Sequence, residues 1–497
     1  MEVQHAPIAD DACYLALKAR DARFDGRFFT GVTSTGIYCR PVCRVRTPRR
    51  ENCRFFGHAA QAERAGFRPC LRCRPELAPQ DLHWSIQDAS ALLARQAARL
   101  LDEPEAWDGE PPSIERLAQR MGVSDRHVRR IFEAHFGVSP VQYLQTRRLL
   151  TAKQLLADSD LPITQVALIS GFASVRRFNA AFAAHYGLNP TQLRRAGGPP
   201  RLQGTAVRLG YRPPYDVAAM LAFFGRRQLA GIEAVSDTGL LRTLRVTAGG
   251  RAHAGWLAAA FDPARCQLVL QVGDGLRGVL PQVIRRLRAA FDLDADPLAI
   301  NAVLREHFPD GDGIRVPGTL DGYELAVRAV LGQQVSVAAG RTFAQRIVDR
   351  FGDPIATPHA ALTRLFPAPA VLAAAEPSAL GELGIVRQRQ AAIQAIARAA
   401  DEGRLALHGG ADVPAAIAAL KALPGIGDWS AQYIAMRALR WPDAFPAGDA
   451  ALQKALGVRG QPRPARAAEA ASAAWRPWRS YAVLRAWNAA PARTTLE

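Results

Sequence analysis

The stretch Cys39-Arg-Pro-Val-Cys43, separated by 26 residues from Cys70-Leu-Arg-Cys73, decides how the N-terminal part of this chain folds. Two close cysteine pairs at this separation are typical of a zinc ion held by four thiolates. We therefore predict a Zn²⁺ site formed by Cys39, Cys43, Cys70 and Cys73. Arginines surround both pairs, which favours a metal site that faces nucleic acid. A purely structural metal is the alternative, because a core of fewer than about 80 residues rarely supplies more than ~3–5 kcal/mol.

The composition is that of a long, basic, globular chain. Its 497 residues exceed one ordinary core and predict three or more domains. The net charge is +18, and both halves of the chain carry more basic than acidic residues, so both can meet a polyanion. An arginine-rich and alanine-rich proteome from a GC-rich genome is the alternative explanation of this charge.

No targeting or membrane segment is expected. The first ten residues carry acids and no apolar stretch, which argues against a signal peptide, and no apolar run reaches membrane-spanning length. Three scattered cysteines, Cys13, Cys53 and Cys266, add no disulfide pattern and fit a reducing compartment. We expect a protein of the bacterial cytoplasm, associated with the nucleoid and not with a membrane.

The pattern along the chain predicts a multidomain, mainly α-helical protein. Helical periodicity dominates 113–196 and the region after about 278, whereas alternating apolar residues between 204 and 275 predict a small sheet. The predicted parts are a small zinc-bound α/β domain over 1–78, a connecting helix (81–101) and linker (102–112) within 79–112, a tandem helix-turn-helix domain over 113–197, a small α/β sheet domain over 204–277, and an all-α helix-hairpin-helix domain over 278–497.

Residues 114–140 and 163–190 repeat one pattern. In each copy a helix of about two turns meets a glycine turn, at Gly122 or Gly171, and a serine then caps an arginine-bearing helix. The repeat predicts two helix-turn-helix units whose second helices read DNA, with two ordinary helical hairpins as the alternative. The side chains expected to contact DNA are Arg126, Arg129, Arg130, Arg176 and Arg177.

Residues 20–75 resemble the N-terminal domain of Ada-type methylphosphotriester repair proteins, through segments such as S-T-G-I-Y-C-R-P-V-C and A-G-F-R-P-C-L-R-C-R-P. The resemblance implies that Cys39 accepts a methyl group irreversibly from a methylated DNA phosphate. It also implies that Thr35, Arg46 and Arg68 contact the DNA backbone. The alternative is that zinc is only a scaffold and that no methyl transfer occurs.

The helix-turn-helix repeat is similar to the AraC-type DNA-binding module, notably in G-F-A-S-V-R-R-F-N-A-A-F. Joined to the zinc domain, it resembles the N-terminal half of Ada-type transcription regulators. This architecture implies methylated DNA and promoter DNA as double-stranded partners, and RNA polymerase as a further partner. The P-C-H-R motif of O6-alkylguanine transferases is missing, and Cys266 lies in R-C-Q-L instead, so we do not expect that activity.

A second constellation lies near the C-terminus. Leu423-Pro-Gly-Ile-Gly427 stands between two helical stretches, and Asp449 follows 22 residues after Gly427. The glycines allow a tight turn whose backbone N–H groups, around Gly425 and Gly427, can face a DNA phosphate. A helix-hairpin-helix followed by an acidic residue at this distance is typical of DNA glycosylases of that superfamily.

Residues 209–497 resemble the 3-methyladenine DNA glycosylase II (AlkA) family more widely, in L-G-Y-R-P-P-Y-D, in D-G-Y-E-L-A-V-R-A-V-L-G-Q-Q-V-S-V and in W-R-P-W-R-S-Y-A. The resemblance implies base flipping and hydrolysis of the N-glycosidic bond of alkylated purines such as 3-methyladenine. A transcription activator whose glycosylase-like tail is inactive and only grips DNA is the alternative, which the presence of Asp449 with the hairpin disfavours.

The resemblance assigns the site residues. Asp449 is predicted to be the catalytic carboxylate, with a helix N-cap as its alternative or additional role. Trp429, Tyr433 and Trp487 are predicted to line the base pocket, where core packing is the alternative. Gln334 stands where relatives insert a bulky apolar wedge into the duplex.

Further features define the expected chemistry. Gly448 and Ala450 replace an acid and an aromatic that some relatives carry, which affects the shape of the base pocket. Trp429 occupies the position at which lyase members carry a Schiff-base lysine, so we predict a monofunctional glycosylase. No cysteine cluster follows, so no iron–sulfur cluster is expected.

Overall fold

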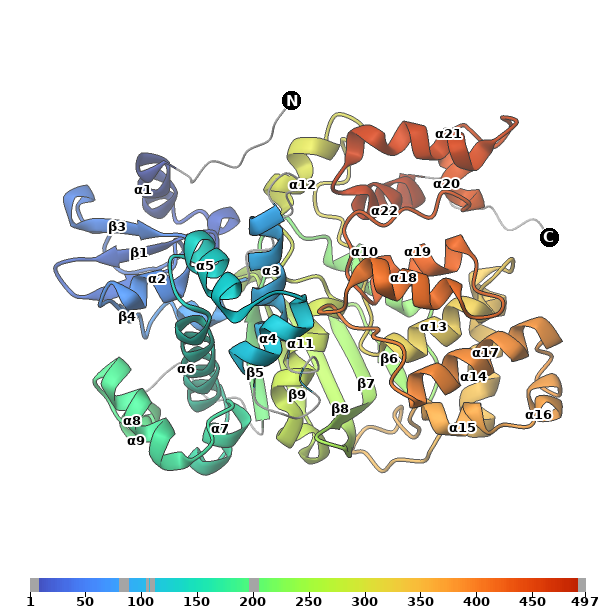
Figure 1. The fold of residues 1–497 in the computed structure, drawn as a ribbon, viewed down its shortest axis with the longest axis horizontal. Coiled ribbons are helices and arrows are strands. Elements are labelled where there is room, and N and C mark those ends of the chain that lie inside the picture. The colour runs from blue at the N-terminus through green and yellow to red at the C-terminus, as the bar shows by residue number, and fades with distance from the viewer. Residues whose placement is uncertain (1–8, 80–88, 104–106, 108–111, 196–204, 490–497) are drawn as a thin grey trace.

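The computed structural model of the chain describes residues 9–79, 89–103, 107, 112–195 and 205–489 (Figure 1). The predicted break at 197–200, most of the linker predicted over 102–112 and the first part of the connecting helix predicted over 81–101 lie outside the described residues. Within the described residues, no helix is long and apolar enough to cross a membrane.

The N-terminal domain is a four-stranded sheet with the order β3-β1-β2-β4. The pairs β3–β1 and β1–β2 are antiparallel, whereas β2 and β4 run parallel, with Tyr38 opposite Pro69. This parallel pairing brings the end of β2 beside the chain that leaves β4. The elements are α1 (Asp10–Ala19), η1 (Ala22–Phe24), β1 (Phe29–Val32), β2 (Ile37–Cys39), η2 (Arg50–Asn52), β3 (Cys53–Phe56), α2 (Ala59–Arg64), β4 (Arg68–Pro69) and η3 (Pro75–Leu77).

Seven α-helices follow within the part of 89–195 that the structure describes, and their ends match the signals in the sequence. Ser124 and Ser174 accept hydrogen bonds from the backbone N–H groups of His127 and Arg177, and Gly122 has a left-handed φ of 66°. The repeated helix-turn-helix pattern is therefore confirmed. The helices are α3 (Ala89–Asp102), α4 (Ile114–Met121), α5 (Asp125–Phe136), α6 (Pro140–Asp158), α7 (Ile163–Ile169), α8 (Val175–Tyr186) and α9 (Pro190–Arg195).

The predicted small sheet is antiparallel, with the strand order β5-β9-β8-β7-β6. Gly249 and Gly250 form the two-residue turn between β7 and β8, and both have positive φ, as a tight hairpin turn requires. Leu268, Leu270 and Val272 are buried in the core and alternate with the more exposed Gln267, Val269 and Gln271. The elements are β5 (Thr205–Gly210), α10 (Val217–Gly225), β6 (Glu233–Val235), β7 (Gly239–Ala248), β8 (Arg251–Asp262), η5 (Pro263–Arg265), β9 (Gln267–Val272) and η6 (Asp274–Val279).

The C-terminal part is helical, as expected. Asp321, Ser336 and Asp412 cap the helices that begin after them. The elements are α11 (Leu280–Ala290), α12 (Pro297–Leu304), α13 (Gly322–Leu331), α14 (Val337–Phe351), α15 (Pro369–Ala373), α16 (Pro377–Gly381), α17 (Arg387–Asp401), α18 (Val413–Lys421), α19 (Asp428–Arg437), α20 (Ala450–Ala455), α21 (Pro464–Ala471), η7 (Ser472–Trp475) and α22 (Arg479–Ala489).

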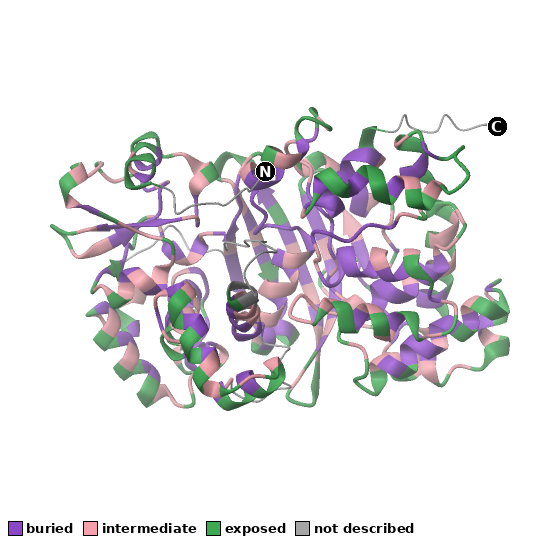
Figure 2. Cartoon of the chain, turned by 45° about the horizontal axis from the view of Figure 1, so that its top comes forward, coloured by how far each residue is buried: buried purple, intermediate pink, exposed green. Residues whose placement is uncertain are grey.

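The N-terminal modules are packed against the C-terminal ones through buried charged groups. Asp158, at the end of α6, accepts hydrogen bonds from Arg74 of the zinc domain at 2.5 Å and from the guanidinium of Arg208 in β5 at 2.9 Å. Arg212, which is fully buried, donates to the carbonyls of Asp25 at 2.7 Å and Asp294 at 2.8 Å. Figure 2 shows that this central region, around the five-stranded sheet, is largely buried, whereas exposed residues line the outer helices.

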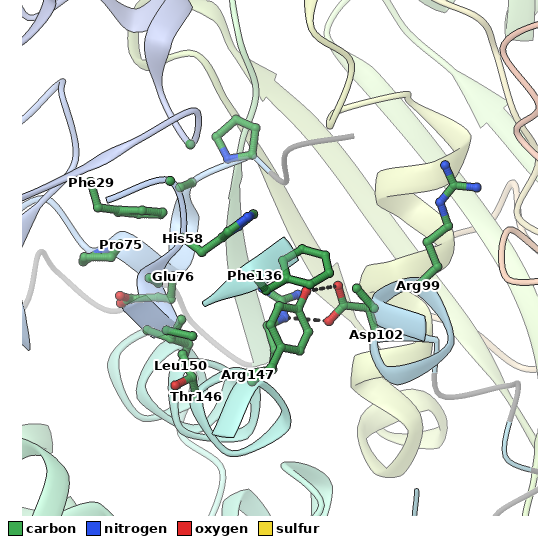
Figure 3. A pocket seen from close by; sticks show the side chains of 18 of the residues that line it. Phe29, His58, Pro75, Glu76, Arg99, Asp102, Phe136, Thr146, Arg147 and Leu150 are labelled. Carbon is green, nitrogen blue, oxygen red and sulfur yellow. Dashed lines mark hydrogen bonds and ion pairs between the residues drawn. The ribbon is translucent and has the colours of Figure 1, made fainter. Parts of the chain in front are cut away.

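A cavity of about 130 Å³ lies where the zinc domain, α3, α5 and α6 meet α11 (Figure 3). In its wall, Asp102 accepts hydrogen bonds from Tyr143 and from Arg147, both at 2.8 Å. The nearby Trp107 is buried and donates from its indole to the Leu100 carbonyl at 2.7 Å. The acidic stretch predicted as a linker therefore contains anchored residues, because its tryptophan enters the core beside α3.

Candidate active site and metal centre

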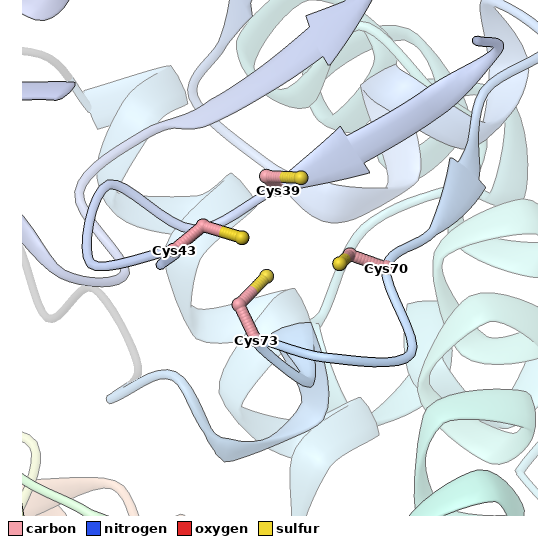
Figure 4. Close-up of side chains that lie close together, drawn as sticks. All are labelled: Cys39, Cys43, Cys70 and Cys73. Carbon is pink, nitrogen blue, oxygen red and sulfur yellow. The ribbon is translucent and has the colours of Figure 1, made fainter. Parts of the chain in front are cut away.

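The four predicted zinc ligands converge (Figure 4). Cys39 ends β2 and Cys43 lies in the following turn, while Cys70 and Cys73 lie in the loop after β4. The four sulfur atoms all lie within 4.8 Å of one another, and three of the residues are buried. Four soft sulfur donors at this spread fit a tetrahedral ion with Zn–S bonds of about 2.3 Å. The residues therefore form a metal site, and zinc is the ion that this donor set fits best.

Backbone and side-chain donors hold the cysteine loops. The N–H of Arg40 donates to Cys73 Sγ at 3.3 Å, and the Arg40 guanidinium donates to the Cys73 carbonyl at 3.0 Å. Asp25 neutralises this buried guanidinium through two hydrogen bonds. From the helix-turn-helix module, Lys153 donates to the Cys70 carbonyl at 3.3 Å. The loop of Cys70 and Cys73 is thus fixed by Arg40 of the first cysteine pair and by Lys153 of α6, and no sequence pattern identified these contacts.

The residues predicted to contact DNA around the zinc site are exposed. Thr35 lies in the β1–β2 turn, where its hydroxyl donates to the Val32 carbonyl at 3.3 Å, and Arg46 lies in the loop after Cys43. Arg68 reaches the carbonyl of Tyr186 at 3.5 Å, at the end of α8. The structure therefore places Arg68 against the second helix-turn-helix unit, with part of its side chain still open to solvent.

The five arginines predicted to read DNA are exposed on α5 and α8. Arg126, Arg129 and Arg130 belong to α5, where Arg130 also contacts His127 at 3.1 Å, and Arg176 and Arg177 lie in the first turn of α8. The packed faces of the same helices hold Val128 and Phe178, which are both completely buried. Exposure of the arginines leaves their guanidinium groups available to phosphates and base edges.

The hairpin between α18 and α19 contains two glycines, and the lack of a side chain serves a different purpose at each. Gly425 has a φ of +76°, and a Cβ there would lie 3.0 Å from the Cβ of Ala392. Gly427, the N-cap of α19, has an ordinary φ of −86°, and a Cβ there would meet no atom within 4 Å. The fold thus requires glycine at 425, whereas the bare backbone at 427 leaves room for a close ligand.

Asp449 stands at the start of α20, where its Oδ1 accepts a hydrogen bond from the N–H of Leu452 at 2.7 Å. The same oxygen accepts from the indole N–H of Trp487 at 3.1 Å, and Oδ2 accepts from the indole N–H of Trp429 at 3.0 Å. The N-cap role considered for Asp449 is therefore confirmed. Three N–H donors fix the orientation of the half-buried carboxylate.

The three predicted pocket aromatics form one group around Asp449. Trp429 and Tyr433 stack with centroids 5.2 Å apart and rings 8° from parallel, and Trp487 lies 6.4 Å from Tyr433. Arg437 donates to the Tyr433 hydroxyl at 2.6 Å. Burial by itself raises the pKa of Tyr433, but the charges of Arg437 and Arg227 outweigh burial and lower the pKa of this phenol. All three rings are half-buried, so each can pack against the protein and still present a face to a ligand.

Gln334 is exposed in the loop between α13 and α14 and has a left-handed φ of +55°, which is uncommon for a residue other than glycine. Its neighbour Gln333 donates from its side chain to the Gly425 carbonyl at 2.9 Å. Sequence reasoning missed Gln333, although the doubled glutamine in L-G-Q-Q-V was visible. Figure 1 shows the zinc domain and α19 to α22 at opposite sides of the molecule, so the metal centre and Asp449 form two separate sites.

Four family models match the chain in order. The metal binding domain of Ada matches residues 12–76, a helix-turn-helix domain matches 117–196, and the AlkA N-terminal domain matches 206–321. The model of the HhH-GPD superfamily of base excision DNA repair proteins matches residues 327–480. Together these models cover both candidate sites.

Relatives that match the whole chain, and relatives that match part of it, agree with these family models. A probable bifunctional transcriptional activator/DNA repair enzyme AlkA of Mycobacterium tuberculosis is 38% identical over 499 residues, which is 98% of this chain and 96% of the relative. The DNA-3-methyladenine glycosylase 2 of Escherichia coli is 35% identical over 48% of this chain and 82% of its own length. The bifunctional transcriptional activator/DNA repair enzyme Ada of Escherichia coli is 33% identical over 38% of this chain and 50% of its own length.

Proposed function

The chain belongs to the family of bifunctional transcriptional activators and DNA repair enzymes that join an Ada-type metal-binding domain to an AlkA-type glycosylase, and we propose that Asp449 catalyses its removal of alkylated purines from DNA. The observation that carries the proposal is the Asp449 carboxylate, fixed between the indoles of Trp429 and Trp487 close to the hairpin helix α19. The substrate class is alkylated purines such as 3-methyladenine.

The proposed chemistry needs only a carboxylate, a water and an aromatic pocket. An alkylated purine such as 3-methyladenine already carries positive charge, so it leaves the sugar without a general acid. The sugar becomes cationic as the bond breaks, and a nearby carboxylate stabilises that charge in the transition state. The rings of Trp429, Tyr433 and Trp487 would attract a cationic base by cation–π interaction.

The hairpin supports a grip on the strand that carries the lesion. Backbone N–H groups at the start of α19 are left without partners inside the helix, as at every helix start, and they attract a phosphate. Gly427 leaves that approach open, because no side chain lies there. Gln334, at an exposed loop tip, would fill the gap that the flipped nucleotide leaves in the duplex. Trp429 occupies the Schiff-base position, so we propose hydrolysis of the glycosidic bond without strand cleavage.

At the metal centre we propose Zn²⁺ held by Cys39, Cys43, Cys70 and Cys73, where it would keep the cysteines as thiolates. Sγ of Cys39 would form a bond to the methyl carbon of a methylated DNA phosphotriester. The bond from that carbon to the phosphate oxygen breaks, its electron pair stays on oxygen, and an anionic phosphodiester remains. Thr35 and Arg46 would hold the DNA backbone during this step.

Methyl transfer would also strengthen DNA binding. The formal charge of the site changes from −2 to −1 when one thiolate becomes a neutral thioether. At ~8 Å and an effective dielectric of ~20 this removes about 2 kcal/mol of repulsion for each nearby phosphate before salt screening. The methylated protein would bind promoter DNA through α5 and α8 and activate transcription beside RNA polymerase, in the bacterial cytoplasm.

Release of free 3-methyladenine from methylated duplex DNA tests the glycosylase. The wild type should release the base, whereas Asp449→Asn, which keeps the shape of the side chain but loses its charge, should be slower by at least a hundredfold. Equal release by both would refute the role of Asp449. No release by either would leave a transcription regulator whose C-terminal half only grips DNA.

A labelled-methyl assay tests the metal centre separately. Wild-type protein should take one methyl group from methylated DNA and then bind promoter DNA more tightly, whereas Cys39→Ala should do neither. A protein that binds zinc but never accepts a methyl group would show that the metal is only a scaffold.

A further inference from the structure

Gln333 connects the loop between α13 and α14 to the hairpin and the start of α19, which lie 92 and 97 residues further along the chain. Its side-chain Nε2 donates to the carbonyl of Gly425 and to the hydroxyl oxygen of Ser430, both at 2.9 Å. Gly425 belongs to the hairpin, and Ser430 follows the pocket residue Trp429 in α19. The next residue along the chain is Gln334, at the exposed tip of the loop.

Both protons of the Gln333 amide are used, because an amide nitrogen carries two donors and each meets one acceptor. Arg389 of α17 donates to the main-chain carbonyl of Gln333, which fixes the backbone of the same residue. The guanidinium of Arg389 also lies 6.0 Å from the ring of Phe343 in α14. Side chain and backbone of Gln333 are therefore held from two directions.

This anchoring explains how Gln334 keeps an uncommon conformation. A left-handed backbone at a residue other than glycine persists only where its surroundings impose it. Gln334 is exposed and has a φ of +55°, and its backbone is flanked by the contacts of Gln333 on one side and by the Ser336 cap of α14 on the other. Without them the loop can relax, and its tip would move relative to the hairpin.

We propose that Gln333 is a positioning residue for base flipping, which fixes the inserting side chain of Gln334 relative to the hairpin that holds the DNA backbone. The proposal rests on the glycosylase function proposed above. Gln333 touches neither the base nor the sugar in this scheme. Its effect passes through Gln334, so it should matter only when a gap in the duplex has to be filled.

The test compares one alkylated purine in two duplexes under single-turnover conditions. In the first duplex the lesion is paired, and flipping leaves a gap that Gln334 fills. In the second the lesion is a one-nucleotide bulge, and flipping leaves a continuous stack with no gap. Gln333→Ala should slow release from the paired duplex about tenfold and release from the bulged duplex less than twofold.

Two further variants separate positioning from general stability. Gln333→Glu keeps the shape of the side chain but cannot donate as a carboxylate, so it should reproduce the paired-lesion defect even if Gln333→Ala folds poorly. Gln461→Ala, at an exposed glutamine remote from the hairpin in sequence, is the matched control and should change neither rate. Thermal unfolding of each variant reports any loss of stability.

A double-variant cycle decides whether Gln333 acts through Gln334. Gln334→Ala should show the same preference for the bulged lesion, and adding Gln333→Ala should slow it no further. The proposal would be overturned if the two substitutions slowed base release multiplicatively. It would also be overturned if release from paired and bulged lesions slowed equally.

Fluorescence of 2-aminopurine beside the lesion, measured with the Asp449→Asn protein, reports flipping without catalysis. If the wild type releases no base, this signal still shows whether Gln333→Ala impairs flipping, and an unchanged signal would overturn the proposal. Failure of the proposed glycosylase function and failure of the Gln333 role are thereby distinguished.

Discussion

The first helix-turn-helix unit (α4 and α5) and the second (α7 and α8) share their turn glycines and serine caps but pack against different neighbours. Phe132 and Phe136 of the first unit lie in a core with Leu100 and Trp107, beside the connecting helix α3. Phe178 and Phe182 of the second unit lie in a core that continues into the glycosylase sheet, through residues such as Leu209.

The zinc domain contacts the ends of both second helices, through different side chains. Gln61 donates to the carbonyl of Phe136 at 3.0 Å, and Arg64 donates to the carbonyl of Gly137, so two side chains of α2 cap the first unit. At the second unit, Arg68 reaches the Tyr186 carbonyl at 3.5 Å, and Glu63 of α2 lies 2.8 Å from His185 Nε2 of α8. We expect these similar local sequences to differ in stability, because the surrounding core supplies most of the stability of a short helix and the two cores differ.

Removing the metal should produce the largest difference in stability between the two helix-turn-helix units. Structural zinc contributes an apparent ~10–16 kcal/mol to small metal domains, so chelation should unfold the zinc domain. The first unit should then lose most of its protection against hydrogen exchange in α5, while α8 keeps most of its protection through the glycosylase core. Adding zinc back is the control, and equal loss in α5 and α8 would contradict this comparison.

Matched core substitutions in the two units should give the next largest difference, which is measured as the denaturant midpoint of the glycosylase. Phe132 and Phe182 are both completely buried, and replacing either with alanine should cost about 3–5 kcal/mol. Phe182→Ala should also lower the denaturant midpoint of the glycosylase, whereas Phe132→Ala should leave that midpoint unchanged. Glycosylase activity after incubation in graded urea measures the difference. A common shift for both variants would indicate one cooperative unit.

Asp158 tests the junction between the second unit and its neighbours. It accepts hydrogen bonds from Arg74 and Arg208 and is completely buried, so Asp158→Ala removes the acceptor that both arginines share and should cost about 3 kcal/mol. The exposed Asp274, which pairs with Arg277, is the control, and Asp274→Ala should change the free energy of unfolding by less than ~1 kcal/mol. Urea denaturation measures both values.

The helix caps should give the smallest and most similar effects. Ser124→Ala and Ser174→Ala each remove one hydrogen bond to a backbone N–H and should each cost about 1 kcal/mol. Circular dichroism during thermal unfolding measures the loss. Because capping is local, a much larger effect in one unit would show that its cap is coupled to the surrounding core.

The sequence predicted most of the elements and the four cysteines that cluster in the N-terminal domain. Turn glycines, capping serines and alternating strands are local signals, and the helix-turn-helix pairs, the small sheet and the hairpin follow them. The four cysteines were found because metal ligands have a characteristic spacing. The anchoring of Trp107 and the contact of Arg68 with α8 were not predicted, since neither has a signal within a few residues of its position.

The separation along the chain between the residues involved distinguishes what the sequence determined from what the tertiary structure decided. The sequence alone determined the metal ligand set, the repeated DNA-binding units and the pairing of a hairpin with Asp449, because each depends on residue types at short, fixed spacings. Only the tertiary structure decided that two indoles fix Asp449, that Gln333 links a loop to the hairpin, and that Asp158 joins three modules. Those contacts join residues brought together by packing, and hydrogen-bond geometry exists only once the surrounding core has placed both partners.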